Sequence, residues 1–386
     1  MSHVLFVVLA EKGHVHPFIA PAQALMQRGH AVSFYAPCDL RAPLARAGFK
    51  QDVFVGEQAP SPGNRGEAFA ALVRDPARLR RWIHQMLIDS VATEIPRLTE
   101  VVAAARPDLI VADPMAYAAP IVAHRNNLPW VGLSTSLNPV VPATWHSELI
   151  ATTSALPRAE LFAAHGLPDA KFRVSDCLSP FLNVAWTSPA LVGPAPPDVL
   201  LAGASLPTIR GDESDPVSLD PSRPLIFMAL GSQIGHQPRM FEVVIEASRC
   251  QSWQLVLAMG DLAGSIRLPP DAHALPYAPQ LALLARAQAM ISHGGANSVM
   301  EALAHGVPLL ISPICNDQPH NARFVAAAGA GVTCDLAVAQ PDEVRTYLTA
   351  LCADGPMRAA AARIADSYRA AGGATRVATA IEELLR

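Results

Sequence analysis

The sequence contains no closely spaced pair of cysteines. Its six cysteines, at positions 38, 177, 250, 315, 334 and 352, form neither a C-x-x-C pair nor a cysteine–histidine cluster with zinc spacing. Cysteines so far apart in a chain of this size are typical of reduced, mostly buried thiols. They favour a cytosolic protein and give no basis for a structural zinc site.

Long apolar runs are also missing. The apolar run VLFVVLA at residues 4–10 is too short to span a membrane, and no basic segment precedes it as in a signal peptide. We therefore expect a soluble protein of the cytoplasm.

Neither sign of charge is in large excess. The chain has 29 Lys and Arg against 33 Asp and Glu, which gives no reason to expect a nucleic acid partner. Hydrophobic residues make up 51% of the sequence, which is typical of a globular protein with a large buried core. The length of 386 residues exceeds one typical core and predicts two domains. We expect a monomer or a homodimer.

Short apolar runs alternate with helical patterns along the chain. Residues 4–10 and 31–37 are predicted strands, and the helix between them is predicted to begin at Pro17. Strand–helix–strand units of this kind predict α/β domains with doubly wound, Rossmann-like parallel sheets. The pattern restarts at residue 225, after a stretch rich in Pro, Gly, Ser and Asp. The predicted organisation is an N-terminal domain at 1–204, a linker at 205–222, a C-terminal domain at 223–370 and a C-terminal helix at 371–386 that packs back on the N-terminal domain.

A tight loop joins a predicted strand to a predicted helix in the second half. In ISHGGANSVMEAL the strand ends at Ser292 and the helix begins near Ala296. Ligands of open α/β sheets bind beyond the carboxyl ends of the strands, and a helix N-terminus attracts anions. The short polar residues in the first turn could equally be simple helix caps. The candidate ligand-binding residues are Gly294, Gly295, Asn297, Ser298 and, one turn further on, Glu301, which could accept hydrogen bonds from ribose hydroxyls.

Flanking segments extend this motif. The ordered run PQ…HGG-x-NS-x-x-E-x-x-x-x-G-x-P…DQ…NA over residues 279–322 resembles the donor-binding signature of family 1 glycosyltransferases. These enzymes have the GT-B fold, in which two Rossmann-like domains face each other across a cleft. The likeness extends more weakly over the whole chain and is closest to bacterial members that glycosylate natural products such as macrolide antibiotics. It implies transfer of a hexose from a UDP- or dTDP-sugar to a hydroxyl of a small, largely apolar acceptor.

The resemblance also implies roles for single residues. Tyr277, where the family usually has Trp, would stack on the base, and Gln280 would contact the ribose. Asp317 and Gln318 would bind the sugar hydroxyls, and Ser232 would meet the diphosphate. The same diphosphate would be held by His293, Asn297 and Ser298, and the ribose hydroxyls by Glu301.

No Asp-x-Asp motif occurs in the chain. A metal-dependent transferase normally uses such carboxylates to hold Mg²⁺ against the diphosphate. We therefore expect no metal and no cofactor, with the nucleotide sugar as a co-substrate. The polar loop at residues 293–298 would stabilise the leaving diphosphate instead.

Two histidines follow the first predicted strand. The sequence EKGHVHP places His14 and His16 directly before Pro17. An imidazole with a pKa near 6.5 is suited to removing the acceptor proton, and the helix N-terminus is expected to disfavour its cationic form. Asp113, at the end of the predicted strand 107–113, could orient the His14 ring. The family resemblance implies the same pair as the catalytic dyad of an inverting reaction.

The acceptor pocket is expected in the N-terminal half. The segments 55–100 and 137–180 carry aromatic and leucine-rich patterns that predict an apolar lining. His16 is interpreted as a helix cap or as part of this lining. The candidate lining residues are His16, Trp82, Trp145 and His146.

Three other functions fit parts of the sequence. A dinucleotide-dependent oxidoreductase would also begin with a strand–helix–strand unit, but AEKGHVHP lacks the G-x-G-x-x-G fingerprint. A sugar-nucleotide epimerase with the GT-B architecture stays open, and it would need catalytic carboxylates in the cleft and no acceptor pocket. A non-catalytic auxiliary protein should have lost the donor loop or the His–Asp pair, and both are present.

Overall fold

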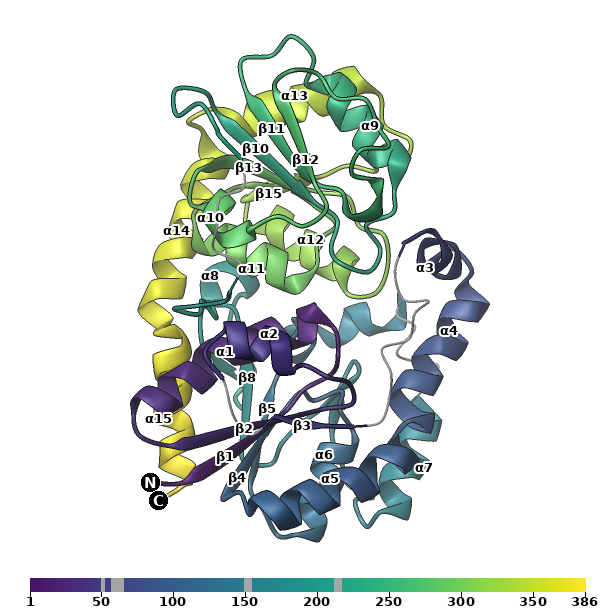
Figure 1. Ribbon diagram of the computed structural model, residues 1–386, viewed down its shortest axis with the longest axis vertical. Coiled ribbons are helices and arrows are strands. Elements are labelled where there is room, and N and C mark those ends of the chain that lie inside the picture. Colours follow the sequence, from purple (N-terminus) through teal and green to yellow (C-terminus); the bar gives the residue numbers. More distant parts are fainter. Residues whose placement is uncertain (50–52, 57–65, 149–154, 212–216) are drawn as a thin grey trace.

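Two parallel β-sheets lie at the centres of the two halves of the chain (Figure 1). The computed structural model describes residues 1–49, 53–56, 66–148, 155–211 and 217–386. The first sheet has the order β3 (Val53–Val55), β2 (Ala31–Ala36), β1 (His3–Val7), β4 (Leu109–Ala112), β5 (Trp130–Leu133), β8 (Leu182–Ala185) and β9 (Leu200–Leu201). The second has the order β12 (Ala272–Leu275), β11 (Gln254–Ala258), β10 (Leu225–Ala229), β13 (Ala287–Ser292), β14 (Leu309–Ile311) and β15 (Gly331–Thr333). The strand pairs of both sheets run parallel, which confirms the predicted fold class.

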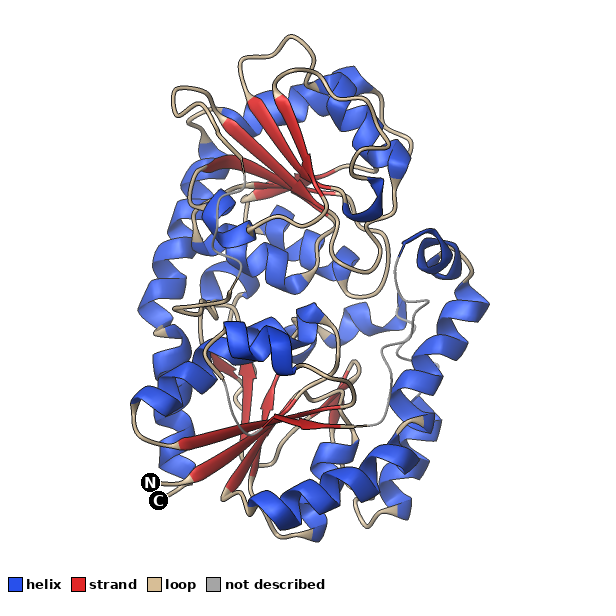
Figure 2. Ribbon diagram, viewed as in Figure 1, coloured by secondary structure: helices blue, strands red, loops and turns tan. Residues whose placement is uncertain are grey.

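Helices cover both faces of each sheet (Figure 2). The helices of the first half are α1 (Lys12–Gln27), α2 (Arg41–Arg46), α3 (Gly66–Val73), α4 (Pro76–His84), η1 (Gln85–Asp89), α5 (Val91–Ala105), α6 (Ala118–Arg125), η2 (Asn138–Val140), η3 (Ala143–Glu148), α7 (Ala155–Ala164) and α8 (Pro189–Val192). Those of the second half are α9 (Pro238–Ala247), η5 (Gly260–Leu262), α10 (Gln280–Leu284), α11 (Ala296–Ala304), α12 (Gln318–Ala327), α13 (Pro341–Cys352), α14 (Pro356–Ala371) and α15 (Gly373–Leu384). A short antiparallel pair, β6 (Phe172–Arg173) and β7 (Asp176–Cys177), lies outside both sheets. No helix in the described ranges is long and apolar enough to cross a membrane.

The central strands are apolar because helices cover both of their faces. Val4 and Phe6 in β1 are fully buried, as are Ile226 and Phe227 in β10. Phe6 pairs in register with Phe34 of β2, and their rings stack with centroids 5.2 Å apart. The continuous apolar runs seen in the sequence are therefore buried parallel strands, as predicted.

The first helix starts earlier than the sequence predicts. α1 begins at Lys12, so Pro17 lies inside the helix, as does Pro21. A proline has no N–H for the carbonyl four residues before it, and Pro21 therefore leaves the Pro17 carbonyl without a helical partner. The Ser205 hydroxyl donates to that oxygen at 2.8 Å. The helix tolerates Pro21 because the side chain of Ser205, which follows β9, supplies the missing donor.

The C-terminal helices run along one side of the molecule and join its halves (Figure 1). α14 packs against α11 of the second half and α8 of the first, and α15 packs against α1. Glu382 of α15 pairs with Arg28 at 2.7 Å and with His30 at 3.1 Å. The Gly373 amide donates to the Ala202 carbonyl at 2.8 Å. The C-terminal segment therefore contacts the first half of the chain.

α3 and α4 reach from the first half to the second on the opposite side (Figure 1). Phe69 and Leu79 from these helices form a buried cluster with Ile234, which follows β10. The side chain of Asp75 caps α4 by accepting from the Ala77 amide at 3.0 Å. This cluster and the C-terminal helices join the two halves at opposite edges of the space between the sheets.

Candidate active site

A cavity of about 760 Å³ lies between the carboxyl ends of the two sheets. Its lining includes α4 and the segments that follow β1, β4 and β5 in the first half, and the segments that follow β10, β11, β12, β13 and β14 in the second. The sequence-predicted residues that line it are His14, His16, Trp82, Ser232, Tyr277, Gln280, His293, Gly295, Asn297, Ser298, Glu301, Asp317 and Gln318. Asp113 lies fully buried behind His14, and Gly294 lies inside its loop, where its φ of 88° favours glycine.

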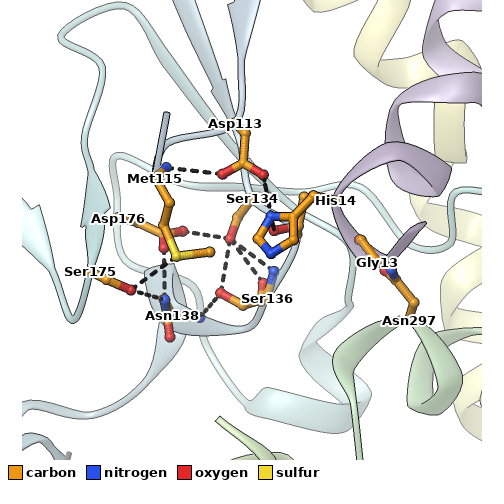
Figure 3. Close-up of polar contacts among 11 residues, drawn as sticks. Gly13, His14, Asp113, Met115, Ser134, Ser136, Asn138, Ser175, Asp176 and Asn297 are labelled. Carbon is orange, nitrogen blue, oxygen red and sulfur yellow. Dashed lines mark hydrogen bonds and ion pairs between the residues drawn. The ribbon is translucent and has the colours of Figure 1, made fainter. Parts of the chain in front are cut away.

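His14 and Asp113 form a hydrogen-bonded pair at the floor of the cavity. Nδ1 of His14 lies 2.5 Å from Oδ2 of Asp113, and the Thr135 hydroxyl lies 3.1 Å from the same nitrogen. The Met115 amide donates to Oδ1 of Asp113 at 2.9 Å and fixes the carboxylate (Figure 3). Since a carboxylate accepts from Nδ1, Nε2 is the nitrogen left to take a proton.

The charge state of His14 differs from the sequence-based expectation. Burial lowers the pKa of His14, but the negative charges of Asp113, Glu11 and Asp176, with Asp113 foremost, together raise it by more, and the net pKa is about 9. We expected the helix N-terminus to keep the ring neutral, and this expectation is wrong. The ring is mostly cationic at neutral pH, so it must lose a proton before it can act as a base.

A second buried carboxylate lies near this pair. Asp176, in β7, is fully buried and accepts hydrogen bonds from the Ser134 hydroxyl at 2.6 Å and from Asn138 Nδ2 at 2.7 Å (Figure 3). The pKa of Asp176 is raised to about 7, mainly by burial and in addition by the negative Asp113, whereas the hydrogen bonds from Ser134 and Asn138 oppose the rise. Sequence analysis missed Asp176, because an isolated Asp in an irregular segment carries no motif.

The loop at the start of α11 is built around His293. Burial lowers the pKa of His293 to about 4, so its ring is uncharged and can offer an N–H but no positive charge. A Cβ on Gly295 would lie 2.5 Å from Nε2 of this ring, and one on Gly231 would lie 2.9 Å from it. Both glycines are therefore needed for the ring to fit between the β10 and β13 loops.

Asn297 connects this loop to the first half. Its Nδ2 donates to the Gly13 carbonyl at 2.6 Å. The N-terminus of α11, predicted to bind an anion, therefore lies against the N-terminus of α1, which carries His14.

Glu301 is paired on both carboxylate oxygens. Arg210 Nη1 lies 2.8 Å from Oε1 and Gln280 Nε2 lies 2.7 Å from Oε2. The side chains of Arg210 and Glu301 are each only 3% exposed, so this is a buried ion pair at the cavity wall. Arg210 lies in the predicted linker, and its role could not be read from a segment that looks like a flexible connection.

The side chains of Asp317 and Gln318 stabilise the start of α12 and the loop before it through hydrogen bonds. Oε1 of Gln318 accepts from the amides of Ile314 and Cys315 at 2.8 and 2.9 Å. Asp317 accepts from Asn321 Nδ2 at 2.8 Å, and burial raises the pKa of Asp317. Both residues line the cavity, so they can hold the loop and still present polar atoms to a sugar.

The wall of the first half carries apolar and polar side chains. Trp82 lines the cavity and makes an edge contact with Phe69, at a centroid distance of 5.3 Å. Trp145 lies elsewhere, stacked on His320 with centroids 5.9 Å apart, which corrects the prediction that it lines the acceptor pocket. The His146 side chain lies outside the described residues. Further lining side chains of this wall include the apolar Ile83, Met86, Leu87, Met115 and Val174 and the polar Thr135, Ser136, Asn138 and Ser175.

A second histidine–aspartate pair lies on the wall of the second half. His236 Nδ1 lies 3.0 Å from Oδ2 of Asp261, and both residues line the cavity. His236 belongs to no motif in the sequence, so no pattern along the chain points to it. Among the described residues, no three His, Cys, Asp or Glu side chains are grouped closely enough to hold a metal ion.

Comparisons with known proteins agree with this geometry. Residues 254–384 match a family model described as erythromycin biosynthesis protein CIII-like, C-terminal domain. The whole chain is 25% identical over 448 aligned residues to demethyllactenocin mycarosyltransferase of Streptomyces fradiae, of which it covers 87%.

Solved structures share the fold. A glycotransferase of kitacinnamycin has a TM-score of 0.80 and 22% identity, with 100% of this chain and 99% of that chain covered. The glycosyltransferase VinC, in complex with dTDP, has a TM-score of 0.70 and 23% identity, with 99% of each chain covered. The chain has the GT-B fold. It is a glycosyltransferase, similar to bacterial enzymes of natural-product biosynthesis, which confirms the resemblance found in the sequence.

Proposed function

We propose that the protein transfers a hexose from a nucleotide diphosphate sugar to a hydroxyl group of a small acceptor, with inversion at the anomeric carbon. The observation that carries this proposal is the His14–Asp113 pair, 2.5 Å apart, in a cavity shared with the N-terminus of α11. A base on one wall and an anion site on the other are the two groups that a single displacement needs.

In the proposed reaction the acceptor oxygen attacks the anomeric carbon of the sugar. The bond from that carbon to the diphosphate breaks, and its electron pair leaves with the nucleoside diphosphate. The acceptor proton passes to Nε2 of His14, and Asp113 stabilises the resulting imidazolium through Nδ1.

The leaving diphosphate is stabilised by groups that are already in place. The free N–H groups at the start of α11 and the Ser298 hydroxyl offer hydrogen bonds without a large rearrangement. The dTDP complex of the similar enzyme VinC supports a nucleotide donor. We propose that no metal ion and no cofactor takes part.

The acceptor is proposed to be largely apolar with a polar group near the reacting hydroxyl. Trp82, Met86 and Leu87 offer an apolar surface, whereas Asn138 and Ser136 offer hydrogen bonds on the same wall. Natural products with several hydroxyl groups on a carbon skeleton fit both parts.

The first test compares His14→Ala, Asp113→Ala and His16→Ala. We expect the first two to lower the turnover of a glycosylated acceptor by at least about a hundredfold, with nucleotide sugar affinity by calorimetry changed little. His16→Ala should keep most of the turnover. If His14→Ala keeps its turnover and His16→Ala loses it, the base has been assigned to the wrong histidine.

The second test uses the nucleotide sugar alone and in the presence of EDTA. An epimerase would convert the donor without an acceptor, and the proposed transferase would not. Proton NMR of the glycoside should show the inverted anomeric configuration. Strict dependence of the rate on a divalent cation would contradict the metal-free reaction.

A further inference from the structure

Lys12 reaches across the cavity to the Tyr277 ring, which is expected to stack on the nucleobase of the donor. Its ammonium nitrogen lies 3.6 Å from the centroid of the Tyr277 ring. Lys12 begins α1 in the first half, and Tyr277 follows β12 in the second, so this cation–π contact joins the two walls. Tyr277 is 45% exposed, and both residues line the cavity.

The backbone next to Lys12 is held against the start of α11. The carbonyl of the adjacent Gly13 accepts from Asn297 Nδ2 at 2.6 Å, and Asn297 lies in the first turn of α11. Lys12 is therefore anchored beside the helix N-terminus, and its long side chain extends from there to the Tyr277 ring. Its ammonium can reach both the proposed nucleobase site at Tyr277 and the proposed diphosphate site at the start of α11.

The charges around the cavity give Lys12 a distinct role. The described residues that line the cavity include one lysine, Lys12, and one arginine, Arg210. Arg210 is buried in its ion pair with Glu301, the cationic His14 ring is paired with Asp113, and the His293 ring carries no charge at neutral pH. Lys12 is exposed and has a long, flexible side chain, so its ammonium can move toward an anion in the cavity.

We propose that Lys12 binds the diphosphate of the nucleotide donor. The nucleobase takes the face of Tyr277 that Lys12 covers. The displaced Lys12 ammonium then moves onto the phosphate oxygens beside α11. Because His14 follows two residues later in the same helix, donor binding also holds this proposed general base in position. This inference rests on the proposed function and adds a donor contact supplied by the acceptor-side domain.

Separate measurements with nucleosides and nucleoside diphosphates test the proposal. Calorimetry would compare Lys12→Met, Lys12→Arg and wild type with thymidine, uridine, dTDP and UDP. Lys12→Met should weaken the better-bound nucleoside diphosphate about tenfold, which is the loss of about 1.4 kcal/mol. The same variant should bind the matching nucleoside as well as wild type or better, because the Tyr277 face is vacant. Lys12→Arg should retain most of the diphosphate affinity.

Lys171→Met is the matched control. Lys171 is exposed and does not line the cavity, so this variant removes the same charge and should leave all four affinities unchanged. An equal loss for nucleoside and diphosphate in Lys12→Met would show a merely structural role and overturn the proposal. Unchanged diphosphate affinity would overturn it as well. If wild type binds neither diphosphate, the proposed function itself fails, and this result is distinct from both of the others.

Discussion

Asn297 donates a hydrogen bond of 2.6 Å to the carbonyl of Gly13, and Pro17 is the reason that this carbonyl is available. In a regular helix the N–H of residue 17 would bind the carbonyl of residue 13, and proline has no N–H. The vacant acceptor lies one residue before His14. A proline in α1 thus creates the contact by which the second half of the chain positions the helix of the proposed base.

This relationship predicts coupling between Pro17 and Asn297. Asn297→Ala leaves the Gly13 carbonyl without a partner and should lower the free energy of unfolding by about 1 kcal/mol. In the Pro17→Ala background the new N–H can bind the same carbonyl, so Asn297→Ala should cost much less. Urea unfolding of the two single variants and the double variant measures the coupling. Strictly additive changes would show that the two residues act independently.

The pH dependence of the reaction should follow His14. With a pKa of about 9, the ring is cationic in the free enzyme at neutral pH, and a base must be uncharged. We expect kcat/KM to rise with pH through a midpoint near pH 9 and to level off above it. Asp113→Asn removes the carboxylate that raises this pKa, and the remaining effect of burial lowers it. The residual activity of that variant should therefore level off at a lower pH. A profile with the same midpoint in both proteins would contradict the assignment.

The buried pair of Arg210 and Glu301 should be essential for stability. Arg210→Met leaves the Glu301 carboxylate buried without its cation, and we expect the free energy of unfolding to fall by about 3–5 kcal/mol. Chemical unfolding monitored by circular dichroism measures the change. Arg249→Met is the control, because Arg249 pairs with Glu246 at the exposed surface of the protein. That pair should contribute at most about 1 kcal/mol, and an equal loss in the two variants would contradict the prediction.

Asp176 should make the protein less stable as the pH rises. Its pKa is about 7 in the folded protein against an ordinary value of 3.8. Between these values the folded state binds more protons than the unfolded state, so the free energy of unfolding falls as the pH increases. Above pH 7 this contribution no longer changes.

The Asp176→Asn variant tests this contribution. It should flatten the dependence of the melting temperature on pH between pH 4 and 7. The contribution of His14 falls in a separate window, between its ordinary pKa of 6.5 and about 9, where its stabilisation is lost as the pH rises. A melting temperature of Asp176→Asn that falls between pH 4 and 7 as steeply as in wild type would rule out the proposed titration.

Local patterns are sufficient for the fold and for much of the site. The apolar run at residues 4–10 overlaps β1 and the run at 225–232 contains β10, because strands buried on both faces need side chains without polar groups. The helix predicted near Ala296 begins at that residue. Parallel strands bring their carboxyl ends to one edge of a sheet, so the order of strands and loops along the chain is enough to assign the residues that follow them to one cavity.

The predictions that the structure corrects are those that depend on contacts between segments far apart in the sequence. The predicted helix start at Pro17 is too late, because the sequence around it does not show that Asn297 and Ser205 supply the missing donors. The helix alone suggests an uncharged His14, whereas a carboxylate 99 residues away determines its charge.

The order of residues in the chain is enough to specify strands, helices and the loops that follow them, since these depend on near neighbours and on the burial of apolar side chains. Which side chains become partners across the cavity depends on how the two halves and the predicted linker pack together. Arg210 with Glu301 and Lys12 with Tyr277 are contacts of this second kind. They are decided by tertiary structure, because charge and hydrogen bonding act over a few ångströms in space, whatever the distance along the chain.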